Sequence, residues 1–375
     1  MSKRSPRTSQ SNDQISMCIA REVCASRTIV QFQGFDLPEV IRLRPKENIQ
    51  ISQPAEPAVR LDIDRIRSSI PRIAPVFRNT PQYICPPLGA ALDCEIILKL
   101  ETANPIRCFK GRGTETVMAR LADSPDFKAA ICASAGNLGQ ALAYSGQRRG
   151  ISTTVVVGSD ANPYKLERIR ALGATVRIVD GDIEDARDLA RRIAESEGAF
   201  LVEDSENLDT CEGAGTIGIE LVEGVGPVDA VLVALGGGAM ATGVGYVFKC
   251  LAPHVEIVCV QPKGAPAMAL SWRARSVVET DRVDTIADGV AGRFPIPAVL
   301  DDLLIVADHV ALVEEDSIIE GMRLLYRHAG LVVEPSAALG VAAILEDRSR
   351  YRDRRVVTII CGANVIPADF ERWVR

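Results

Sequence analysis

A chain of 375 residues is long enough for two domains, or for one large domain with an insert. Its 47% apolar and 25% charged residues are ordinary for a soluble globular protein, and a net charge of −6 gives no electrostatic reason to expect a nucleic-acid partner. No apolar run approaches the roughly 18 residues of a membrane span, and the first residues lack a signal-peptide pattern. These totals predict a soluble, cytoplasmic protein that binds neither nucleic acid nor membrane.

The patterns of the cysteines and histidines predict neither a disulfide framework nor a metal site. The ten cysteines are scattered through apolar segments and include no Cys-x-x-Cys pair, which is typical of reduced, buried thiols in a cytosolic protein. The histidines at 254, 309 and 328 lack the spacing of metal ligands, so no metal site is expected.

The chain begins with a polar stretch and becomes regular after it. Residues 1–57 show no sustained periodicity and read as an N-terminal extension that is partly disordered. From Leu61 onward, apolar strands alternate with amphipathic helices. Strands are expected at 96–100, 129–132, 153–158, 175–180, 200–204, 230–235, 256–262 and 356–360. Helices are expected at 62–70, 113–122, from the loop at 134–140 through 147, and at 164–173, 183–198, 215–225, 241–250 and 316–328.

This alternation predicts an α/β fold with parallel sheets and helices on both faces. In such folds, ligands bind beyond the carboxyl ends of the strands. Four stretches that could carry chemistry lie at or just after such ends: 104–113, 134–140, 236–239 and 361–364. Their placement favours one shared site.

Lys110 is the most chemically informative residue of the first stretch. It follows Phe109 and precedes Gly111-x-Gly113, which predicts a tight turn where neighbours approach closely. Lysines are usually surface residues. A partly buried amine, however, loses proton affinity and can form a Schiff base with a carbonyl cofactor.

The glycine run Gly236 to Ala239 lies between a strand and a helix. Exposed backbone N–H groups and a helix N-terminus form an anion cradle suited to a phosphate. A dinucleotide fingerprint is the competing interpretation, but it expects an acidic residue about 20 positions on. The following strand ends instead in Gln261, so a single phosphate is favoured over NAD.

The other two stretches are weaker when taken alone. The loop from Ser134 to Gly139 offers donors to a carboxylate, although, taken alone, an ordinary helix N-cap with turn glycines is the favoured interpretation. Cys361 ends the last strand and is either a buried filler or a ligand-facing thiol. Glu334 is either an acid near a helix cap or a polar group beside a ligand.

In this order, C-F-K-G-R-G, S-A-G-N-x-G, the glycine run, E-P-S and C-G-A-N resemble the pyridoxal-phosphate enzymes of the tryptophan-synthase-β fold type. The resemblance is closest to the serine/threonine dehydratases and serine racemases, and it covers roughly residues 60–375. It implies two open, mostly parallel sheets flanked by helices (fold type II). It also implies a homodimer, with a small mobile domain, 128–205, inserted in a large cofactor-binding domain made of 58–127 and 206–375.

The resemblance further implies a role for each motif. Lys110 would form the internal aldimine with pyridoxal 5'-phosphate, Asn137 would bond to the ring hydroxyl, and Cys361 would face the pyridine nitrogen. The implied cofactor-binding residues are Lys110, Phe109, Asn137, Gly236, Gly237, Gly238, Ala239, Met240, Glu334 and Cys361. The implied substrate-binding residues are Ser134, Ala135, Gly136, Asn137 and Leu138, with Arg107 as a further candidate.

This chemistry predicts β-elimination. A thiol does not keep the pyridine nitrogen protonated, so the ring is a weaker electron sink that suits a short-lived carbanion. Lys110 can remove the α-proton as general base. Loss of the β-hydroxyl from L-threonine, L-serine or 3-hydroxyaspartate then leads to a 2-oxo acid and ammonia. The protein is therefore predicted to be an ammonia-lyase of the threonine/serine dehydratase kind.

Three departures from the family pattern matter. Ala135 replaces the second serine of the racemases, which disfavours racemisation. Gln261 and Ala267 stand where metal-dependent relatives have acids, so a divalent ion is not expected. Arg107 lies in a replacement of the usual Thr-Gly-Ser and suggests the hypothesis that a second, side-chain carboxylate is bound.

Three alternatives stay open. Within enzymes, β-replacement or a threonine-synthase-like reaction would need a second, nucleophilic substrate. A non-catalytic binder of the cofactor or an amino acid is an alternative from another class, and a nicotinamide enzyme is a distant third.

Overall fold

The computed structural model of the chain describes residues 59–124, 126–159 and 161–375. The predicted N-terminal extension, 1–57, lies outside these ranges, as do Cys18 and Cys24. Ala55–Arg375 forms one compact unit, which holds everything described below.

The larger sheet has six strands in the order β1-β2-β10-β7-β8-β9. All neighbouring strands pair in parallel except β1, which pairs antiparallel with β2 at one edge. The late strand β10 lies in the middle, between β2 and β7. Its strands are β1 (Gln82–Ile84), β2 (Glu95–Leu100), β7 (Ala230–Ala234), β8 (Glu256–Pro262), β9 (His309–Val313) and β10 (Arg355–Ile360).

The smaller sheet is built from residues between 129 and 201 and has four parallel strands in the order β5-β4-β3-β6. Alternate side chains along β3 and β4 pack into two separate hydrophobic clusters, one beneath α4 and α5 and one beneath α6. The strands are β3 (Ala129–Ala133), β4 (Ser152–Gly158), β5 (Thr175–Val179) and β6 (Phe200–Leu201).

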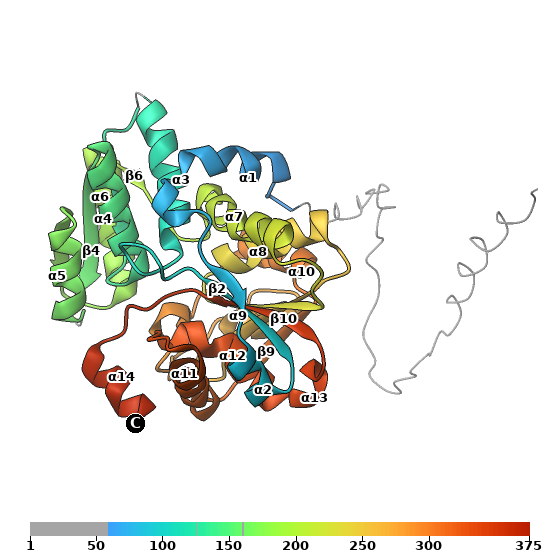
Figure 1. The fold of residues 1–375 in the computed structure, drawn as a ribbon. Helices are drawn as coiled ribbons and strands as arrows, with labels where there is room; N and C mark the ends of the chain where they lie inside the picture. Colours follow the sequence, from blue (N-terminus) through green and yellow to red (C-terminus); the bar gives the residue numbers. More distant parts are fainter. Residues whose placement is uncertain (1–58, 125, 160) are drawn as a thin grey trace, which may run out of the picture. The chain divides into compact units, whose positions relative to one another are not determined.

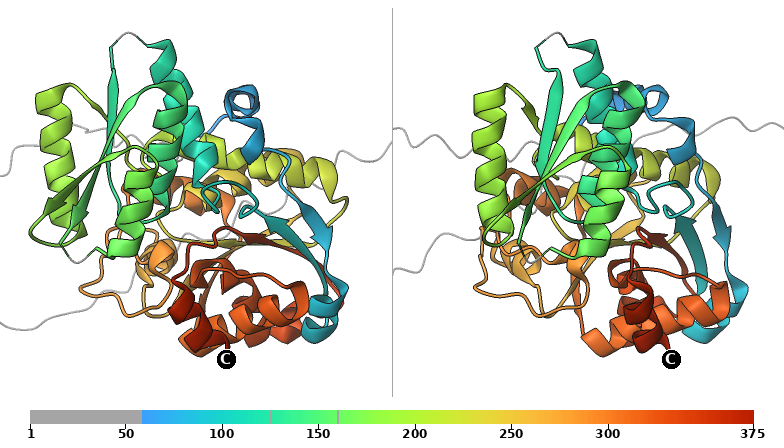
Figure 2. Two further views of the ribbon diagram at one scale, coloured as in Figure 1. Left: turned by 60° about the vertical axis from the view of Figure 1, so that its left-hand side comes forward. Right: turned by 90° about the vertical axis from the view of Figure 1, so that its left-hand side faces the viewer.

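Helices cover both faces of each sheet, which explains why the strands read as continuous apolar runs. Figure 1 shows α7 and α8 on one face of the larger sheet and α11 and α12 on the other, and Figure 2 shows the two sheets from further sides. The helices are α1 (Ile63–Ser69), α2 (Pro86–Leu92), α3 (Lys110–Asp123), α4 (Asn137–Arg149), α5 (Pro163–Ala171), α6 (Ile183–Glu197), α7 (Leu208–Gly224), α8 (Ala239–Leu251), α9 (Ala267–Ala274), α10 (Pro297–Val306), α11 (Glu315–Ala329), α12 (Leu339–Glu346), α13 (Arg348–Tyr351) and α14 (Pro367–Val374). Short 3-10 turns occur at Ile70–Arg72, Pro75–Phe77, Asp288–Val290 and Pro335–Ala338.

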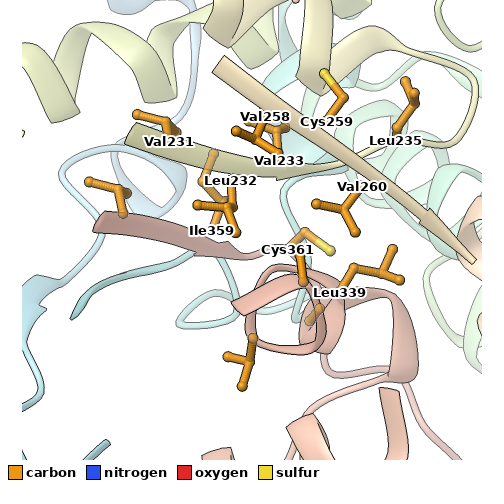
Figure 3. Close-up of a cluster of buried hydrophobic side chains, with 14 of the residues drawn as sticks. Val231, Leu232, Val233, Leu235, Val258, Cys259, Val260, Leu339, Ile359 and Cys361 are labelled. Carbon is orange, nitrogen blue, oxygen red and sulfur yellow. The ribbon is translucent and has the colours of Figure 1, made fainter. Parts of the chain in front are cut away.

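The main hydrophobic core lies between the larger sheet and these helices. Figure 3 shows part of it, where valines of β7 and β8 lie beside Leu339 of α12 and Cys361, the residue after β10. Fully burying an aliphatic side chain of this kind contributes roughly 1.5–3 kcal/mol. The core therefore fixes the strand ends, from which the loops of the site project.

The predicted fold class is confirmed, but several boundaries are wrong. Helix α3 begins at Lys110 rather than Gly113, and α8 begins at Ala239 rather than near 241, because the glycines that predict turns lie in or at the start of these helices. The expected strand at 200–204 is only two residues long. Strands β1 and β9 were not predicted.

Candidate active site

Lys110 is the first residue of α3 and is aimed at a small cavity. Its Nζ lies 4.7 Å from the centroid of the Phe109 ring and pairs with the Oδ2 of Asp204, which follows β6. Its side chain is 16% exposed, so the amine is neither a surface group nor fully enclosed. The cavity is lined by Phe109, Lys110, Gly113, Thr114, Leu138, Asp204, Thr210 and Ala239.

Asp204 was not predicted from the sequence. Its Oδ2 accepts from Lys110, while its buried Oδ1 has no hydrogen-bond partner among the described residues. It lies inside the segment 200–204, which was predicted as a strand, so nothing in the sequence marked its carboxylate as a site residue. The geometry makes Asp204 the counter-charge of the candidate catalytic amine.

Backbone hydrogen bonds join the lysine loop to the segment after β10. Cys108 and Gly362 form an isolated antiparallel bridge. The N–H of Phe109 donates to the carbonyl oxygen of Cys361 at 2.9 Å, and the N–H of Ala363 donates to the carbonyl oxygen of Arg107, also at 2.9 Å. Two stretches that the sequence placed at different strand ends are thus held together.

A buried amide–carboxylate network lies beside this junction. Asn137 Nδ2 donates to both oxygens of Glu334, at 2.9 and 3.1 Å. The backbone N–H of Asn364 donates to Glu334 at 3.0 Å, and Asn364 Nδ2 donates to Asn137 Oδ1 at 2.7 Å. A Cβ on Gly362 would lie 2.4 Å from the Glu334 carboxyl, so only glycine fits there.

Burial raises the pKa of the Glu334 carboxyl, and the hydrogen bonds from Asn137 and Asn364 offset this only in part. Glu334 precedes the Pro335–Ala338 turn without capping it through its side chain. Glu334 thus occupies the N-cap position of this turn, as one interpretation expected, while its carboxylate bonds to Asn137 and Asn364.

The glycine loop connects β7 to α8. The N–H groups of Gly236, Gly237 and Gly238 donate to no acceptor among the described residues, whereas the N–H of Ala239 donates to Ser205 Oγ at 3.0 Å. Gly238 has a φ of 110°, a left-handed conformation that glycine adopts without strain. Three orphaned donors at the N-terminus of a 13-residue helix form a strong anion cradle. Met240, in the first turn of α8, is buried in the core.

The loop after β3 carries the predicted carboxylate-binding residues. Helix α4 begins at Asn137, and its N-cap is Gly136. Ser134 Oγ accepts from the N–H of Gly136 at 3.2 Å, so Ser134 orders the loop, and no side chain of the described residues caps the helix through a hydrogen bond. Leu138 lines the cavity beside Lys110, whereas Ala135 packs against the cluster under α4.

The two cysteines near Lys110 are neutral thiols. Burial, followed by the nearby charge of Glu334, raises the pKa of Cys361 well above its usual value. The same causes raise the pKa of Cys108 to about 12. Cys361 is also part of the main hydrophobic core. It can therefore fill space in the core and lie beside the site at the same time.

Arg107 is exposed and has a φ of 56°, which is unusual for a residue with a side chain. Its Nη2 donates to the carbonyl oxygen of Ala363 at 3.0 Å, so the guanidinium turns toward the site rather than away from it. The backbone N–H of Ala363 also donates to the carbonyl oxygen of Arg107, so the two main-chain segments lie side by side.

Other site types find no support in the described ranges. No group of three His, Cys, Asp or Glu side chains there could hold a metal ion, and no helix there is long and apolar enough to cross a membrane. At the end of β8, Gln261 Oε1 accepts from the N–H of Ala269 at 2.8 Å, which is a structural bond.

Comparison with known proteins decides the family. A family model described as "Pyridoxal-phosphate dependent enzyme" matches residues 73–362. The chain belongs to this family. Its cofactor is accordingly pyridoxal 5'-phosphate, and the predicted resemblance and fold type are confirmed.

Individual relatives support the same assignment. Serine racemase of Oryza sativa subsp. indica is 30% identical over 312 residues, covering 81% of this chain and 91% of the rice protein. L-threo-3-hydroxyaspartate ammonia-lyase of Pseudomonas sp is 29% identical over 306 residues, covering 80% of this chain and 94% of that protein. The structure of maize serine racemase matches with a TM-score of 0.79 and 29% identity, over 83% of this chain and 96% of that chain.

The described residues fit the cofactor of this family. The orphaned N–H groups of Gly236 to Gly238 suit its phosphate, and the amine of Lys110 suits its carbonyl. A neutral thiol at Cys361 suits an unprotonated pyridine nitrogen. These groups come from three separate strand ends of the larger sheet.

Proposed function

We propose that this pyridoxal-phosphate enzyme eliminates water from a β-hydroxy-α-amino acid such as L-threonine, L-serine or 3-hydroxyaspartate. The products are a 2-oxo acid and ammonia, so the protein is an ammonia-lyase. The main support is that the Lys110 amine, paired with one carboxylate, borders a cavity that also touches the Asn137 loop, through Leu138, and the glycine loop, through Ala239.

The cofactor would be held by residues of four loops. Lys110 would bind its carbonyl carbon, Gly236 to Ala239 its phosphate, and Asn137 its ring hydroxyl. Cys361 would face the pyridine nitrogen, with Phe109, Met240 and Glu334 close by. When bound, the cofactor supplies an electron sink for the α-carbon of the substrate.

The side chains and N–H groups of the chain then bind the substrate and transfer the proton. Residues 134–138 hold the substrate carboxylate through N–H groups and the Ser134 hydroxyl. Lys110 Nζ takes the α-proton as general base, and Asp204 stabilises the ammonium that forms. The β-hydroxyl leaves with a proton as water. Hydrolysis consumes one water and releases ammonia, so the net change is loss of ammonia.

Ala135 supports elimination over racemisation. Inverting the α-carbon requires a second base on the face opposite Lys110, and a methyl side chain cannot accept a proton. The relatives named serine racemase make this the reaction to exclude by experiment.

The test is 2-oxo acid release by the purified holoenzyme from L-serine, L-threonine and both 3-hydroxyaspartate diastereomers. The Lys110→Ala variant should lose activity. Lys249→Ala is the matched control, because Lys249 also pairs with an aspartate, Asp308, but lies at the far end of α8. Product at the parental rate from Lys110→Ala, or D-serine as the main product from L-serine, would refute the proposal.

We further propose that residues 128–205 form a small domain that moves against 58–127 and 206–375. Polar contacts cross between these parts: Lys165 pairs with Asp288, Arg293 lies 3.4 Å from Asp182, and Arg168 donates to Asn364. The bonds of Asn137 to Glu334 and Asn364 cross the same boundary, and polar contacts of this kind can break and re-form as a substrate enters. We expect a homodimer from the family resemblance, and a cytoplasmic location from the scattered cysteines.

A further inference from the structure

Two arginines from different parts of the chain converge on the residue pair Ala363–Asn364. Arg107, in the lysine loop, donates from Nη2 to the carbonyl oxygen of Ala363 at 3.0 Å. Arg168, on α5, donates from Nη1 to Oδ1 of Asn364 at 2.7 Å. Because Ala363 and Asn364 are adjacent in the chain, both guanidinium groups are anchored to the same short segment.

Neither arginine forms an ion pair with a carboxylate of the described residues. Two carboxylates lie in the surrounding network, but Glu334 is bound by Asn137 and Asn364, and Asp288 is paired with Lys165. Burial, followed by the positive charge of Arg107, lowers the pKa of Arg168. Two like charges that repel in a partly buried place favour an anion between them.

The arginines adjoin the loop that we propose binds the substrate. Asn364 accepts from Arg168 and donates through Nδ2 to Asn137 Oδ1 at 2.7 Å. Arg168 is thus linked through one side chain to Asn137, within residues 134–138.

We propose that Arg107 and Arg168 bind a second carboxylate, the one on the β-carbon of the substrate, so that the preferred substrate is a dicarboxylic β-hydroxy-amino acid of the 3-hydroxyaspartate kind. A planar guanidinium binds a carboxylate with two parallel hydrogen bonds, which suits this task better than a lysine. Because Arg168 belongs to 128–205 and Arg107 does not, the second carboxylate also holds the two parts together. This inference rests on the proposed elimination reaction.

The first experiment compares kcat/KM for 3-hydroxyaspartate and L-serine in four variants. Arg107→Ala and Arg168→Ala should each lower the ratio of the two values about tenfold or more, since a hydrogen bond to a charged group is lost. Arg168→Lys should keep part of the preference. Arg170→Ala is the control, because Arg170 is on the same helix but exposed, and it should leave the ratio unchanged.

A purely structural role for Arg168 would slow both substrates equally and leave the ratio unchanged, which would overturn the inference. A parent enzyme that prefers L-serine would overturn it as well.

The second experiment needs no turnover. Succinate and butyrate have the same number of carbons but differ by one carboxylate, and their binding to the holoenzyme is measured by calorimetry. Succinate should bind at least about tenfold more tightly, and the Arg107→Ala/Arg168→Ala double variant should abolish the difference. Equal binding of the two acids would overturn the inference. If no β-hydroxy-amino acid is turned over, the elimination reaction fails, while the succinate result still decides the arginine pair.

Discussion

Two lysines close together in the sequence, Lys99 and Lys110, have opposite surroundings. Lys99, on β2, has a fully buried side chain, and its Nζ donates to Thr80, Gln82 and Glu220 at 2.6–3.1 Å. Lys110 has one charged partner, Asp204, and borders a cavity. Burial alone therefore does not indicate a catalytic lysine. What distinguishes Lys110 is that its amine still has donors available and lines the same pocket as Leu138 and Ala239.

Lys99 belongs to a buried network whose charges are matched. The Arg112 guanidinium donates to Glu101 and Glu220, and the Lys99 ammonium donates to Glu220 as well. Burial alone would lower the pKa of Arg112, but the two carboxylates raise it instead. The network joins β2, α3 and α7, so it holds α3 in position while Lys110, at the start of that helix, stays free to react.

The largest effect on activity is expected at Lys110. Replacing Lys110 by alanine removes the general base, so kcat should fall by about 10²–10⁴-fold. The melting temperature should change little, because the lost ion pair is partly exposed. Steady-state kinetics and thermal unfolding of the same preparation check both points. A large loss of stability would place Lys110 with Lys99 as a structural residue.

The largest effect on stability is expected at Arg112. Arg112→Met leaves the buried Glu101 without a cationic partner and Glu220 with Lys99 alone, and should lower the free energy of unfolding by about 3–5 kcal/mol. Urea unfolding measures this difference. Arg352→Met serves as the control, because Arg352 is exposed, and it should cost well under 1 kcal/mol. Equal effects of the two changes would contradict the matched-charge interpretation.

The same network predicts a dependence of stability on pH. Burial alone would raise the pKa of Glu220, but Arg112 and Lys99 lower it from 4.5 to about 2. A lowered carboxyl pKa stabilises the fold above the unfolded pKa, and this stabilisation is lost as the pH falls from about 5 to 2. The group should contribute about 2–3 kcal/mol. Glu220→Gln should make the unfolding free energy flatter across this range in urea titrations at several pH values.

The smallest effect concerns the single partner of Lys110. Asp204→Asn keeps the size of the side chain but removes its charge, so kcat/KM should fall about tenfold while stability changes by less than about 1 kcal/mol. The measurement is kcat/KM beside thermal unfolding, with Asp308→Asn as the control, since Asp308 pairs with Lys249 away from the site. An unchanged kcat/KM would mean that Asp204 is dispensable for Lys110.

The features predicted correctly from the sequence are those that depend on residues close together in the chain. Long apolar strands, the lysine motif and the glycine loop can each be read within a dozen residues, and they were placed at the correct strand ends. β1 was missed because three residues are too few to show a period. β9 was missed although it has five residues, as many as the predicted strands β3, β5 and β7.

The missed site residues depend on long-range contacts. Asp204 meets Lys110 across 94 positions, and Arg168 meets Asn364 across 196. Neither aspartate nor arginine is unusual where it stands, and only the folded chain brings each to its partner. Arg107 could be proposed from a local replacement, but not its neighbour on α5.

The central place of β10 has a consequence for synthesis. Residues 355–360 complete the larger sheet by filling the space between β2 and β7, and residues 361–364 then bond to the lysine loop. A ribosome therefore makes everything from Lys110 to β10 before Lys110 gains its surroundings. Until that moment, the edges of β2 and β7 that face β10 have no partner, and unpaired strand edges of this kind favour aggregation.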